Sequence, residues 1–434
     1  MAAADSTAAI EAAYRVEFPR VVAVLASFTG DIGLAEELAQ DALVDALRQW
    51  RHDGIPRNPG AWLTTVGKRK AIDAFRRDRV SADKYSRIAR ELQTLSPVDT
   101  DDPALGVVSS DEINDDRLRL IFVACHPVLA VPARVALTLR LVGGLTVPEI
   151  ARAYVVPEAT IAQRIVRAKR TIARAGVPFE VPVGEDRLTR LGAVLEVIYL
   201  VFNEGYSATG GEDWVRPELC GEALRLGRVL SGLMPDEAEV YGLVALMELQ
   251  ASRLRARVGP TGAPVLLLDQ DRRMWDRLHI GRGEAALARA DELASPRGPY
   301  ALQAAIAACH ARSFRPEETD WKEIVALYTE LARVMPSPIV ELNRAVAVSR
   351  ASGPAEALAM VDVLVAAGAL DRYHLLYSVR GDLLDQLGRH GEAAVEFERA
   401  AALATNGQER ALMAERARAS RALLAGEPHR TVGG

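Results

Sequence analysis

Apolar residues recur every three or four positions along most of this chain, which is the spacing that places them on one face of an α-helix. The clearest example is residues 145–172, LTVPEIARAYVVPEATIAQRIVRAKRTI. The pattern predicts two helices with a short break between them, and Pro157 is suited to open the second helix. Thr146 and Glu149 have the spacing of a capping box, which starts the first helix. The predicted buried stripe of the second helix consists of Ile161, Ile165, Ala168 and Ile172.

The polar residues of this second helix lie away from its apolar stripe. They are Thr160, Gln163, Arg164, Arg167 and Arg170. A short helix packed against a longer basic helix is the geometry of a helix-turn-helix, whose second helix enters the major groove of DNA. Arg and Gln side chains read the edges of bases there. The segment therefore favours DNA binding over the alternative, an ordinary helical hairpin with a solvated basic face.

The first part of the chain predicts a compact helical domain. Apolar periodicity indicates three helices, over Thr7–Phe28, Leu34–Arg48 and Gly60–Arg77, with a loop at His52–Pro59 before the third. An Asn followed by a Pro, as at the end of this loop, is a typical start of a helix. The side of the second helix away from its apolar stripe carries Glu37, Gln40 and Asp41.

Basic residues are concentrated on the third of these helices, WLTTVGKRKAIDAFRR (62–77). They are Lys68, Arg69, Lys70, Arg76 and Arg77. A basic helix can follow a phosphate backbone while an adjacent loop captures an unstacked base. The alternative is a solvated basic face over a core that Trp62 and Phe75 help to form.

The composition then changes, because residues 91–116 contain eight acidic residues and no basic ones. Pro97, Pro103 and Gly106 lie in the same segment. Like charges repel and these residue types disfavour regular structure, so the segment is predicted to be a flexible acidic linker.

The end of the chain repeats its own pattern. In LGRHGEAAVEFERA (387–400), the offsets of a tetratricopeptide repeat are occupied by Gly388, Ala393, Phe397 and Ala400. Related positions recur 36 and then a further 33 residues upstream, which brackets the 34-residue period of that repeat. The matching residues are Tyr377 and Gly381 on the preceding helix, then Ala357 and Val361, then Ile324, Tyr328, Leu331 and Pro336. The pattern indicates helical repeats, with a nonrepetitive helical bundle as the alternative.

The composition favours helices over sheets, so we predict an all-α fold. Apolar residues make up 49% of the 434 positions and aromatic residues only 5%. The net charge of −5 conceals an asymmetry, since residues 1–176 carry a net charge of +2 and residues 177–434 a net charge of −7. Contact with nucleic acid is therefore expected in the first part, through local basic patches.

The cysteines give no support to a disulfide framework or a metal site. There are three, Cys125, Cys220 and Cys309, and no CxxC motif accompanies the pairs Cys125-His126 and Cys309-His310. So few cysteines in so long a chain indicate a reducing, cytoplasmic setting. We predict no metal and no cofactor.

Membrane association and catalysis are also not expected. No secretory signal is present, and the longest apolar stretch, Leu191–Phe202, contains Glu196 and is too short to span a bilayer. The polar motifs FNEGY (202–206) and DQDRRMWD (269–276) provide no nucleophile with a base at a defined spacing. In a helical array such residues more often cap helices or form buried ion pairs, so we predict that the chain is not an enzyme.

The order of these features resembles the extracytoplasmic-function (ECF) sigma factors of bacterial RNA polymerase. The matching segments are GLAEELAQDALVDALRQW (33–50), NPGAWLTTVGKRKAIDAFRR (58–77) and the helix-turn-helix at 145–172. Residues 116–172 resemble a subgroup that has a long C-terminal extension with tetratricopeptide-like repeats. Segments that resemble this extension are FNEGYSATGG (202–211), DQDRRMWD (269–276), GPYALQAAIAACHA (298–311) and SPIVELNRAVAVS (337–349).

The resemblance implies two partners, the polymerase core and promoter DNA. The clamp helices of the largest core subunits would be bound by Glu37, Gln40 and Asp41. The separated nontemplate strand at the −10 element would be bound by Lys68, Arg69, Arg76 and Arg77. The −35 element would be read by Thr160, Gln163, Arg164 and Arg167.

Two connecting segments also receive roles from the resemblance. The loop His52–Pro59 would hold a flipped base of the −10 element. The acidic linker would run through the active-site cleft of the polymerase, where its carboxylates imitate nucleic acid against a basic channel. The sequence Cys-His-Pro at 125–127 resembles the subgroup pattern, and we interpret it as packing at a helix junction.

We therefore predict four parts in the chain. They are a sigma region-two domain (1–80), an acidic flexible linker (81–115), a sigma region-four helix-turn-helix domain (116–176) and a helical, tetratricopeptide-like extension (177–434). Repeats of paired helices present a groove that suits a protein or peptide partner. The extension would act as a built-in regulator or as a platform that holds the DNA-binding domains in an active arrangement. If it covers the basic helices in an off state, salt should loosen that contact.

The predicted function is that of an alternative sigma factor, which directs core RNA polymerase to promoters and assists their melting. The main alternative is a one-component regulator, which would bind duplex DNA through the helix-turn-helix and sense a ligand or peptide through the repeats. The N-terminal domain and the acidic linker argue against it, because such a regulator needs neither. A repeat scaffold with incidental basic helices is a weaker alternative, which salt-dependent, sequence-specific DNA binding would exclude.

Overall fold

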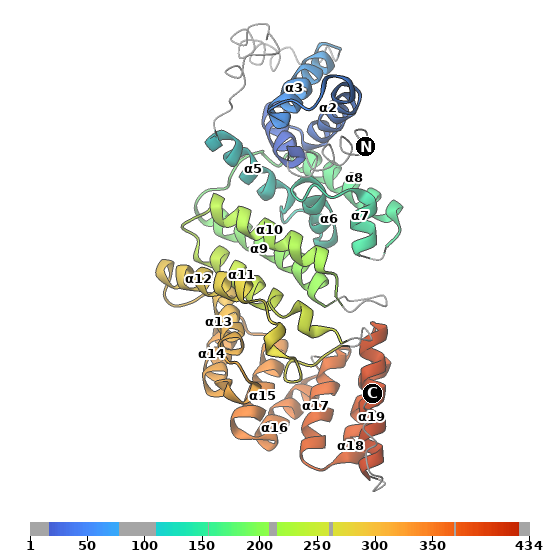
Figure 1. Ribbon diagram of the computed structural model, residues 1–434, viewed down its shortest axis with the longest axis vertical. Coiled ribbons are helices and arrows are strands. Elements are labelled where there is room, and N and C mark those ends of the chain that lie inside the picture. Colours follow the sequence, from blue (N-terminus) through green and yellow to red (C-terminus); the bar gives the residue numbers. More distant parts are fainter. Residues whose placement is uncertain are drawn as a thin grey trace. The chain divides into compact units, whose positions relative to one another are not determined.

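The computed structural model describes residues 17–77, 110–154, 156–207, 215–259, 264–368 and 370–424 (Figure 1). Within these ranges the chain forms helices and no strand, apart from a single backbone bridge between Val258 and Pro264. The prediction of an all-α fold is confirmed. The chain divides into two compact units, Met1–Ile198 and Tyr199–Gly434.

Helices of the first unit follow a helical segment at residues 17–29. They are α2 (Ile32–Asp53), α3 (Pro59–Arg77), α5 (Ser110–Ala124), α6 (Val131–Leu141), α7 (Val147–Ala153), α8 (Glu158–Ala175) and the first part of α9 (Gly184–Tyr206).

The second unit contains the end of α9, ten further α-helices and three short 3-10 helices among the described residues. They are α10 (Pro217–Leu233), α11 (Ala238–Ala251), η1 (Leu254–Arg257), η2 (Arg272–Met274), α12 (Arg277–Leu293), α13 (Pro299–Arg312), η3 (Pro316–Glu318), α14 (Trp321–Val334), α15 (Pro338–Ser352), α16 (Pro354–Ala367), α17 (His374–Gln386), α18 (His390–Leu403) and α19 (Gly407–Leu424). No helix in the described ranges is long and apolar enough to cross a membrane.

The three predicted N-terminal helices are present, with different bounds. Residues 17–29 are helical, whereas residues 7–16 of the predicted first helix lie outside the described ranges. Asp31 starts α2 because its Oδ1 accepts the backbone N–H groups of Gly33 (2.7 Å) and Leu34 (3.1 Å). Gly54, with φ +80°, ends it. The predicted loop His52–Pro59 was therefore too long, since the helix runs through Asp53.

Close packing joins these helices into one domain. A Cβ atom on Gly67 of α3 would lie 2.7 Å from Leu25 Cδ1, so a larger residue there would require the Leu25 side chain to move. Trp50 of α2 meets Trp62 of α3 edge to face, with ring centroids 5.4 Å apart. Such aromatic pairs add about 1 kcal/mol beyond the area that they bury.

The predicted linker ends earlier than expected, because α5 begins at Ser110. Residues 91–109 of that segment lie outside the described ranges. Acidic residues are in general favourable in the first turn of a helix, where the helix dipole is positive. The same charges that indicated a linker are therefore compatible with a helix start.

Cys125 supports the predicted packing role of the Cys-His-Pro sequence. Its thiol is buried just after α5, and Sγ lies 3.2 Å from Thr138 Oγ1 on α6. Burial raises the pKa of this thiol to about 12. The side chain is therefore a neutral packing group, as the prediction required.

The first unit extends beyond the predicted boundary at Gly176. Arg190 of α9 is buried, donates to the carbonyl oxygen of Phe122 (3.3 Å) and lies over the Phe122 ring. Glu196 pairs with Arg134 of α6 (3.1 Å). The unit boundary therefore falls at Ile198, within α9.

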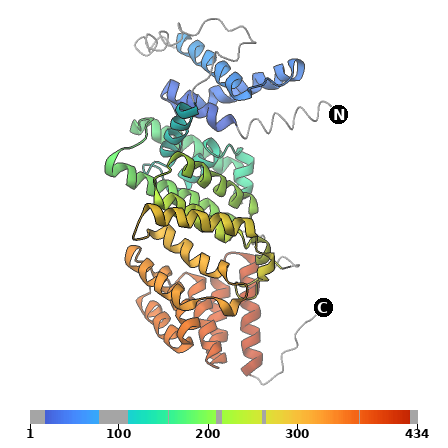
Figure 2. The ribbon, with the colours of Figure 1, turned by 60° about the vertical axis from the view of Figure 1, so that its left-hand side comes forward.

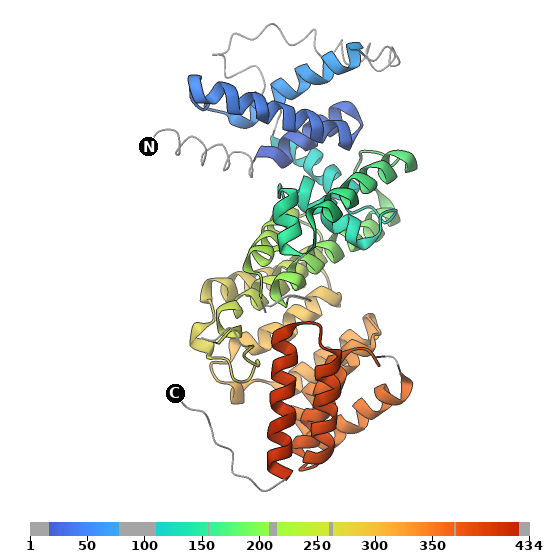
Figure 3. The same ribbon diagram turned by 90° about the vertical axis from the view of Figure 1, so that its right-hand side faces the viewer.

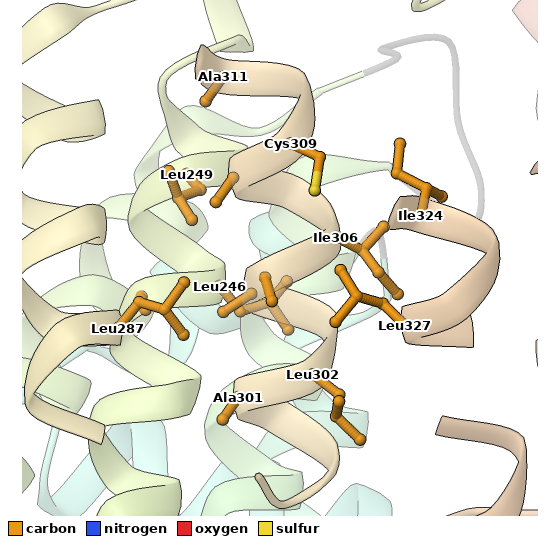
Figure 4. Packing of buried hydrophobic residues seen from close by; sticks show 14 of the residues in the cluster. Leu246, Leu249, Leu287, Ala301, Leu302, Ile306, Cys309, Ala311, Ile324 and Leu327 are labelled. Atoms are coloured by element: carbon orange, nitrogen blue, oxygen red, sulfur yellow. The ribbon is translucent and has the colours of Figure 1, made fainter. Parts of the chain in front are cut away.

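An apolar core in the second unit forms around α13. Figure 4 shows Leu249 of α11 and Leu287 of α12 on one side of this helix, and Leu327 of α14 close to Ile306 on the other. The prediction of a helical extension is confirmed, except that the described residues between α11 and α12 form turns and two 3-10 helices instead of α-helix.

Successive helices from α14 to α19 pack pairwise, each against the next (Figures 2 and 3). Gly381 of α17 faces Phe397 of α18, and a Cβ atom there would lie 2.9 Å from the Phe397 ring. Gly388 takes φ +75° in the turn between them. These two glycines occupy repeat positions named from the sequence, one for close approach and one for the turn.

Candidate functional site

The helices α7 and α8 begin where the sequence predicted. Thr146 Oγ1 accepts the backbone N–H of Glu149 (3.4 Å), and Glu149 Oε2 accepts the backbone N–H of Thr146 (2.8 Å). The capping box is therefore confirmed. Pro157 is the N-cap of α8, one residue before the helix begins at Glu158.

One side of α8 is buried and the other is exposed. The buried residues are the four that the apolar pattern predicted, and α6 and α7 pack against this helix. On the opposite side, Gln163, Val166, Arg167 and Arg170 are exposed and follow the i, i+3, i+4, i+7 spacing of a single helix face. We call these four residues the α8 face.

The predicted −35 residues divide between the α8 face and its edge. Gln163 and Arg167 belong to the face, whereas Thr160 and Arg164 are half-buried beside it. Val166, which is 42% exposed, was missed, although the same helical period would have found it. A valine there suits contact with the methyl group of thymine.

Three polar side chains on or beside the α8 face have no partner within the described part of the chain. Among the described residues, Gln163, Arg164 and Arg167 have no side-chain hydrogen bond or ion pair. We infer that these donors bind an acceptor outside the chain. Guanidinium groups match the acceptors of guanine or of a phosphate.

The basic residues of α3 are in four different situations. Arg69 and Arg76 are exposed and two turns apart, so they share one side of the helix. Lys68 is half-buried, with its ammonium 5.7 Å from the centre of the Phe28 ring. Lys70 pairs with Asp45 of α2 (2.8 Å). Arg77 is the last residue of α3, and its side chain lies outside the described part of the structure.

A pocket of about 450 Å³ lies between α2 and α3, beside the turn that joins them. It is lined by Asp45, Arg48, Gln49, Asp53, Trp62 and Val66. A core role for Trp62 was the alternative reading of the sequence, and the structure gives this residue both a packing contact and a place in the pocket wall. An aromatic wall with nearby hydrogen-bonding groups is suited to an unpaired base.

Glu37, Gln40 and Asp41 are exposed together on α2, as their spacing predicted. Val44 and Leu47 follow on the same stretch of helix and are 44% and 38% exposed. Exposed apolar residues beside charged ones are typical of a surface that binds another protein. The sequence prediction missed these two residues because it treated the helix as having a single apolar stripe.

The neighbouring Glu36 has the opposite environment. It is buried, and its carboxylate accepts from Arg140 Nε of α6 (2.6 Å) and from Lys169 Nζ of α8 (2.9 Å). Burial acts to raise the pKa of Glu36, but Lys169 and Arg140 together hold it below its ordinary value. This charge cluster ties α2 to the helix-turn-helix, and no local sequence signal indicated it.

The polar motifs of the second unit have structural partners. Glu204 and Arg216 form a buried ion pair. Asp276 caps α12 by accepting the backbone N–H groups of Leu278 (2.9 Å) and His279 (3.3 Å). The interpretation of such residues as caps and buried ion pairs is confirmed for these positions.

Comparison with known proteins agrees with this architecture. Residues 13–80 match the model of sigma-70 region 2, and residues 119–172 match that of sigma-70 region 4. Residues 190–291 match a family of unknown function (DUF6596). A region-two domain followed by a region-four helix-turn-helix defines the sigma factors of bacterial RNA polymerase.

Two relatives extend the comparison. An uncharacterized protein, R00370, of Rhizobium meliloti (strain 1021) is 48% identical over 394 residues, 91% of each chain. The ECF RNA polymerase sigma factor SigK of Mycobacterium ulcerans (strain Agy99) is 29% identical over 156 residues, 35% of this chain and 76% of that protein. The chain therefore has the two domains of a sigma factor, is similar to an ECF sigma factor over these domains, and carries a further domain that fits a C-terminal extension.

Proposed function

We propose that this ECF sigma factor uses three separate surfaces to start transcription. The exposed side of α2 with Glu37, Gln40 and Asp41 binds core polymerase. The basic side of α3 holds the separated strand at the −10 element, and the α8 face reads the −35 element. Core polymerase and promoter DNA are the partners, and the protein works in the cytoplasm, where both are found.

The observation that best supports this proposal is the division of α8 into two sides. A helix whose apolar residues are buried against α6 and α7 presents its polar residues in a fixed orientation. Recognition of bases requires such preorganised donors, because a flexible arginine contacts phosphates without reading the sequence.

The strand-holding role of α3 rests on charge and on the adjacent pocket. Arg69 and Arg76 give a positive side that attracts phosphates. The pocket beside Trp62 offers an unstacked base an aromatic wall and carboxylates that accept from an amino group. Binding energy gained from exposed bases offsets the energy needed to unpair them, so melting needs no catalysis by the sigma factor.

For the extension, we propose tetratricopeptide-like repeats that take a protein or peptide partner and regulate or enable the sigma factor. The support is the pairing of α17 with α18 through Gly381 and Phe397, at positions of that repeat. An extension of this kind gives the polymerase a second input, separate from promoter recognition.

Transcription with purified core polymerase and the full chain tests the proposal. We expect a promoter-dependent transcript that is lost in Arg167→Gln and retained in Arg174→Gln, an exposed residue in the last turn of the same helix. Truncation after Gly176 is a poor test, because α9 residues such as Arg190 are buried against α5.

Binding of core polymerase must be measured in parallel. No transcript and no core binding would contradict the proposal and favour a one-component regulator. Core binding without transcript would support the first surface and point to an extension that holds the factor inactive.

A further inference from the structure

Three motifs that lie far apart in the sequence meet in the second unit. Tyr206 ends FNEGY, Trp275 belongs to DQDRRMWD, and His310 ends the ACH of α13. Arg253, just before η1, lies 5.8 Å from the Tyr206 ring centre and 5.6 Å from that of Trp275. Arg272 lies 5.1 Å from the Trp275 ring and donates to the carbonyl oxygen of His310 (3.0 Å). We call these five residues the arginine–aromatic cluster.

Positive charge in this cluster is only partly compensated. Arg253 is half-buried and has no carboxylate or side-chain hydrogen-bond partner among the described residues. Burial, and then the positive charge of Arg253, lower the pKa of Arg272, while Glu317 and Glu318 act in the opposite direction. Burial beside the two arginines lowers the pKa of His310 to about 3, so this ring is neutral at physiological pH.

Several polar atoms of the cluster are buried and have no hydrogen-bond partner within the part of the chain that the structure describes. They are Tyr206 Oη, Arg272 Nε, Trp275 Nε1 and His310 Nδ1. The side chains of Arg272, Trp275 and His310 are more than nine-tenths buried. An unsatisfied buried polar group costs about 1–3 kcal/mol, so a cluster of them calls for a bound molecule.

We propose that the arginine–aromatic cluster is a binding site for a small oxyanion, a carboxylate or a phosphate. Arg253 provides the charge, and Arg272 Nε, Trp275 Nε1 and Tyr206 Oη provide donors for its oxygen atoms. Aromatic rings beside the guanidinium groups exclude water, which strengthens the attraction. The site belongs to the extension alone and goes beyond the proposed role in initiation, since it gives this part of the chain a chemical input.

Ordered water could occupy the cluster in place of an oxyanion. The charge of Arg253 distinguishes these two occupants. Ordered water satisfies donors but does not neutralise a guanidinium group. The probes are inorganic phosphate and citrate, titrated into the full-length chain at constant ionic strength and followed by calorimetry. The variants are Arg253→Gln and a matched control, Arg255→Gln, which changes an exposed arginine in the adjacent 3-10 helix.

We expect saturable binding of at least one probe, weakened at least tenfold by Arg253→Gln and less than twofold by Arg255→Gln. Arg167→Gln, on the DNA-reading helix, serves as a second control for phosphate attracted to that surface. Absence of saturable binding with both probes would overturn the proposal, and so would equal effects of the two substitutions near η1.

A second measurement needs no bound probe. If the charge of Arg253 is uncompensated until an anion binds, Arg253→Gln should raise the midpoint of thermal unfolding in probe-free buffer of low ionic strength, because it removes that charge. A lowered midpoint would mean that Arg253 supports the fold, and it would count against the site.

Discussion

Arg167 and Arg170 on α8 and Arg272 in η2 are the same residue type in opposite environments. Arg167 and Arg170 are exposed on a helix, and Arg167 has no partner among the described side chains. Arg272 is buried and donates to two carbonyl oxygens and a hydroxyl group. We expect the two arginines of α8 to be replaceable without loss of fold, whereas the hydrogen bonds of Arg272 help to hold the fold together. Local charge in a sequence therefore does not tell a binding surface from a structural bond.

The difference also explains where each unit can tolerate change. In α8, the apolar stripe carries the stability and the polar side carries recognition, so the two properties separate by helix face. Around η2, one guanidinium joins His310, Ser313 and Thr319 and also borders the arginine–aromatic cluster. Stability and any binding there depend on the same side chain.

The largest effect is expected from a substitution of Glu36. Its ion pairs with Arg140 and Lys169 show that the first unit also contains cations with a structural role. Glu36→Ala leaves Arg140 and Lys169 without their shared carboxylate and should destabilise the first unit by about 3–5 kcal/mol. Urea unfolding measures this loss. The matched control is Glu37→Ala, an exposed neighbour, for which a change within about 0.5 kcal/mol is expected.

The same cluster sets an acid limit. Because the pKa of Glu36 is lower in the folded protein, its contribution is complete above the ordinary carboxyl pKa and is lost as pH falls through the lowered value. Glu36→Ala should therefore flatten the acid decline of stability. Parallel curves for the variant and the natural chain would contradict this account.

Arg272→Gln is expected to have the next largest effect. It removes three donated hydrogen bonds of 2.9–3.0 Å, two of them buried and one partly buried, and leaves their acceptors unsatisfied, which should cost about 3 kcal/mol of the stability of the second unit. Thermal unfolding followed by circular dichroism measures it. If Arg272→Gln and Arg167→Gln lowered stability equally little in this assay, Arg272 would have no larger structural role than the exposed arginines of α8.

Arg167→Gln should instead weaken binding to promoter duplex by about 1–3 kcal/mol, the value of a good base contact. Its unfolding should stay within about 0.5 kcal/mol of the natural chain. Fluorescence anisotropy with a labelled −35 duplex measures the binding. Equal losses in Arg174→Gln would indicate nonspecific charge rather than a specific contact.

The smallest effect is expected for Arg69→Gln on α3. Loss of one phosphate contact should reduce the slope of log affinity against log salt by about 1 and weaken binding of all sequences alike. Titration of single-stranded −10 DNA at several salt concentrations measures the slope. Lys70→Gln is the contrasting variant. Because Lys70 already pairs with Asp45, its substitution should change the slope less.

Much of the helix-turn-helix could be predicted from sequence. The capping box at Thr146 and the buried stripe at Ile161 and Ile165 depend on contacts within a few residues, which a local pattern records. Helix bounds were less well predicted, since α2 runs to Asp53 and α5 starts at Ser110. Caps and first turns tolerate several residue types, so their positions are weakly encoded.

The exposed site residues were predicted because a helix period separates buried from exposed positions without any knowledge of the neighbours. The apolar residues Val44, Leu47 and Val166 were missed for a related reason. A pattern assigns apolar residues to the core, and only the packing around a helix shows which of them no other helix covers.

By itself, the sequence determined which segments are helical, which faces of α2 and α8 are polar and which glycines permit turns, because these depend on residues within a turn or two. Tertiary structure alone decided the partners across long separations. Glu36 is 104 positions from Arg140, and Arg272 is 38 positions from His310. The effect of a buried charge depends on what surrounds it, and that environment exists only once distant helices have packed.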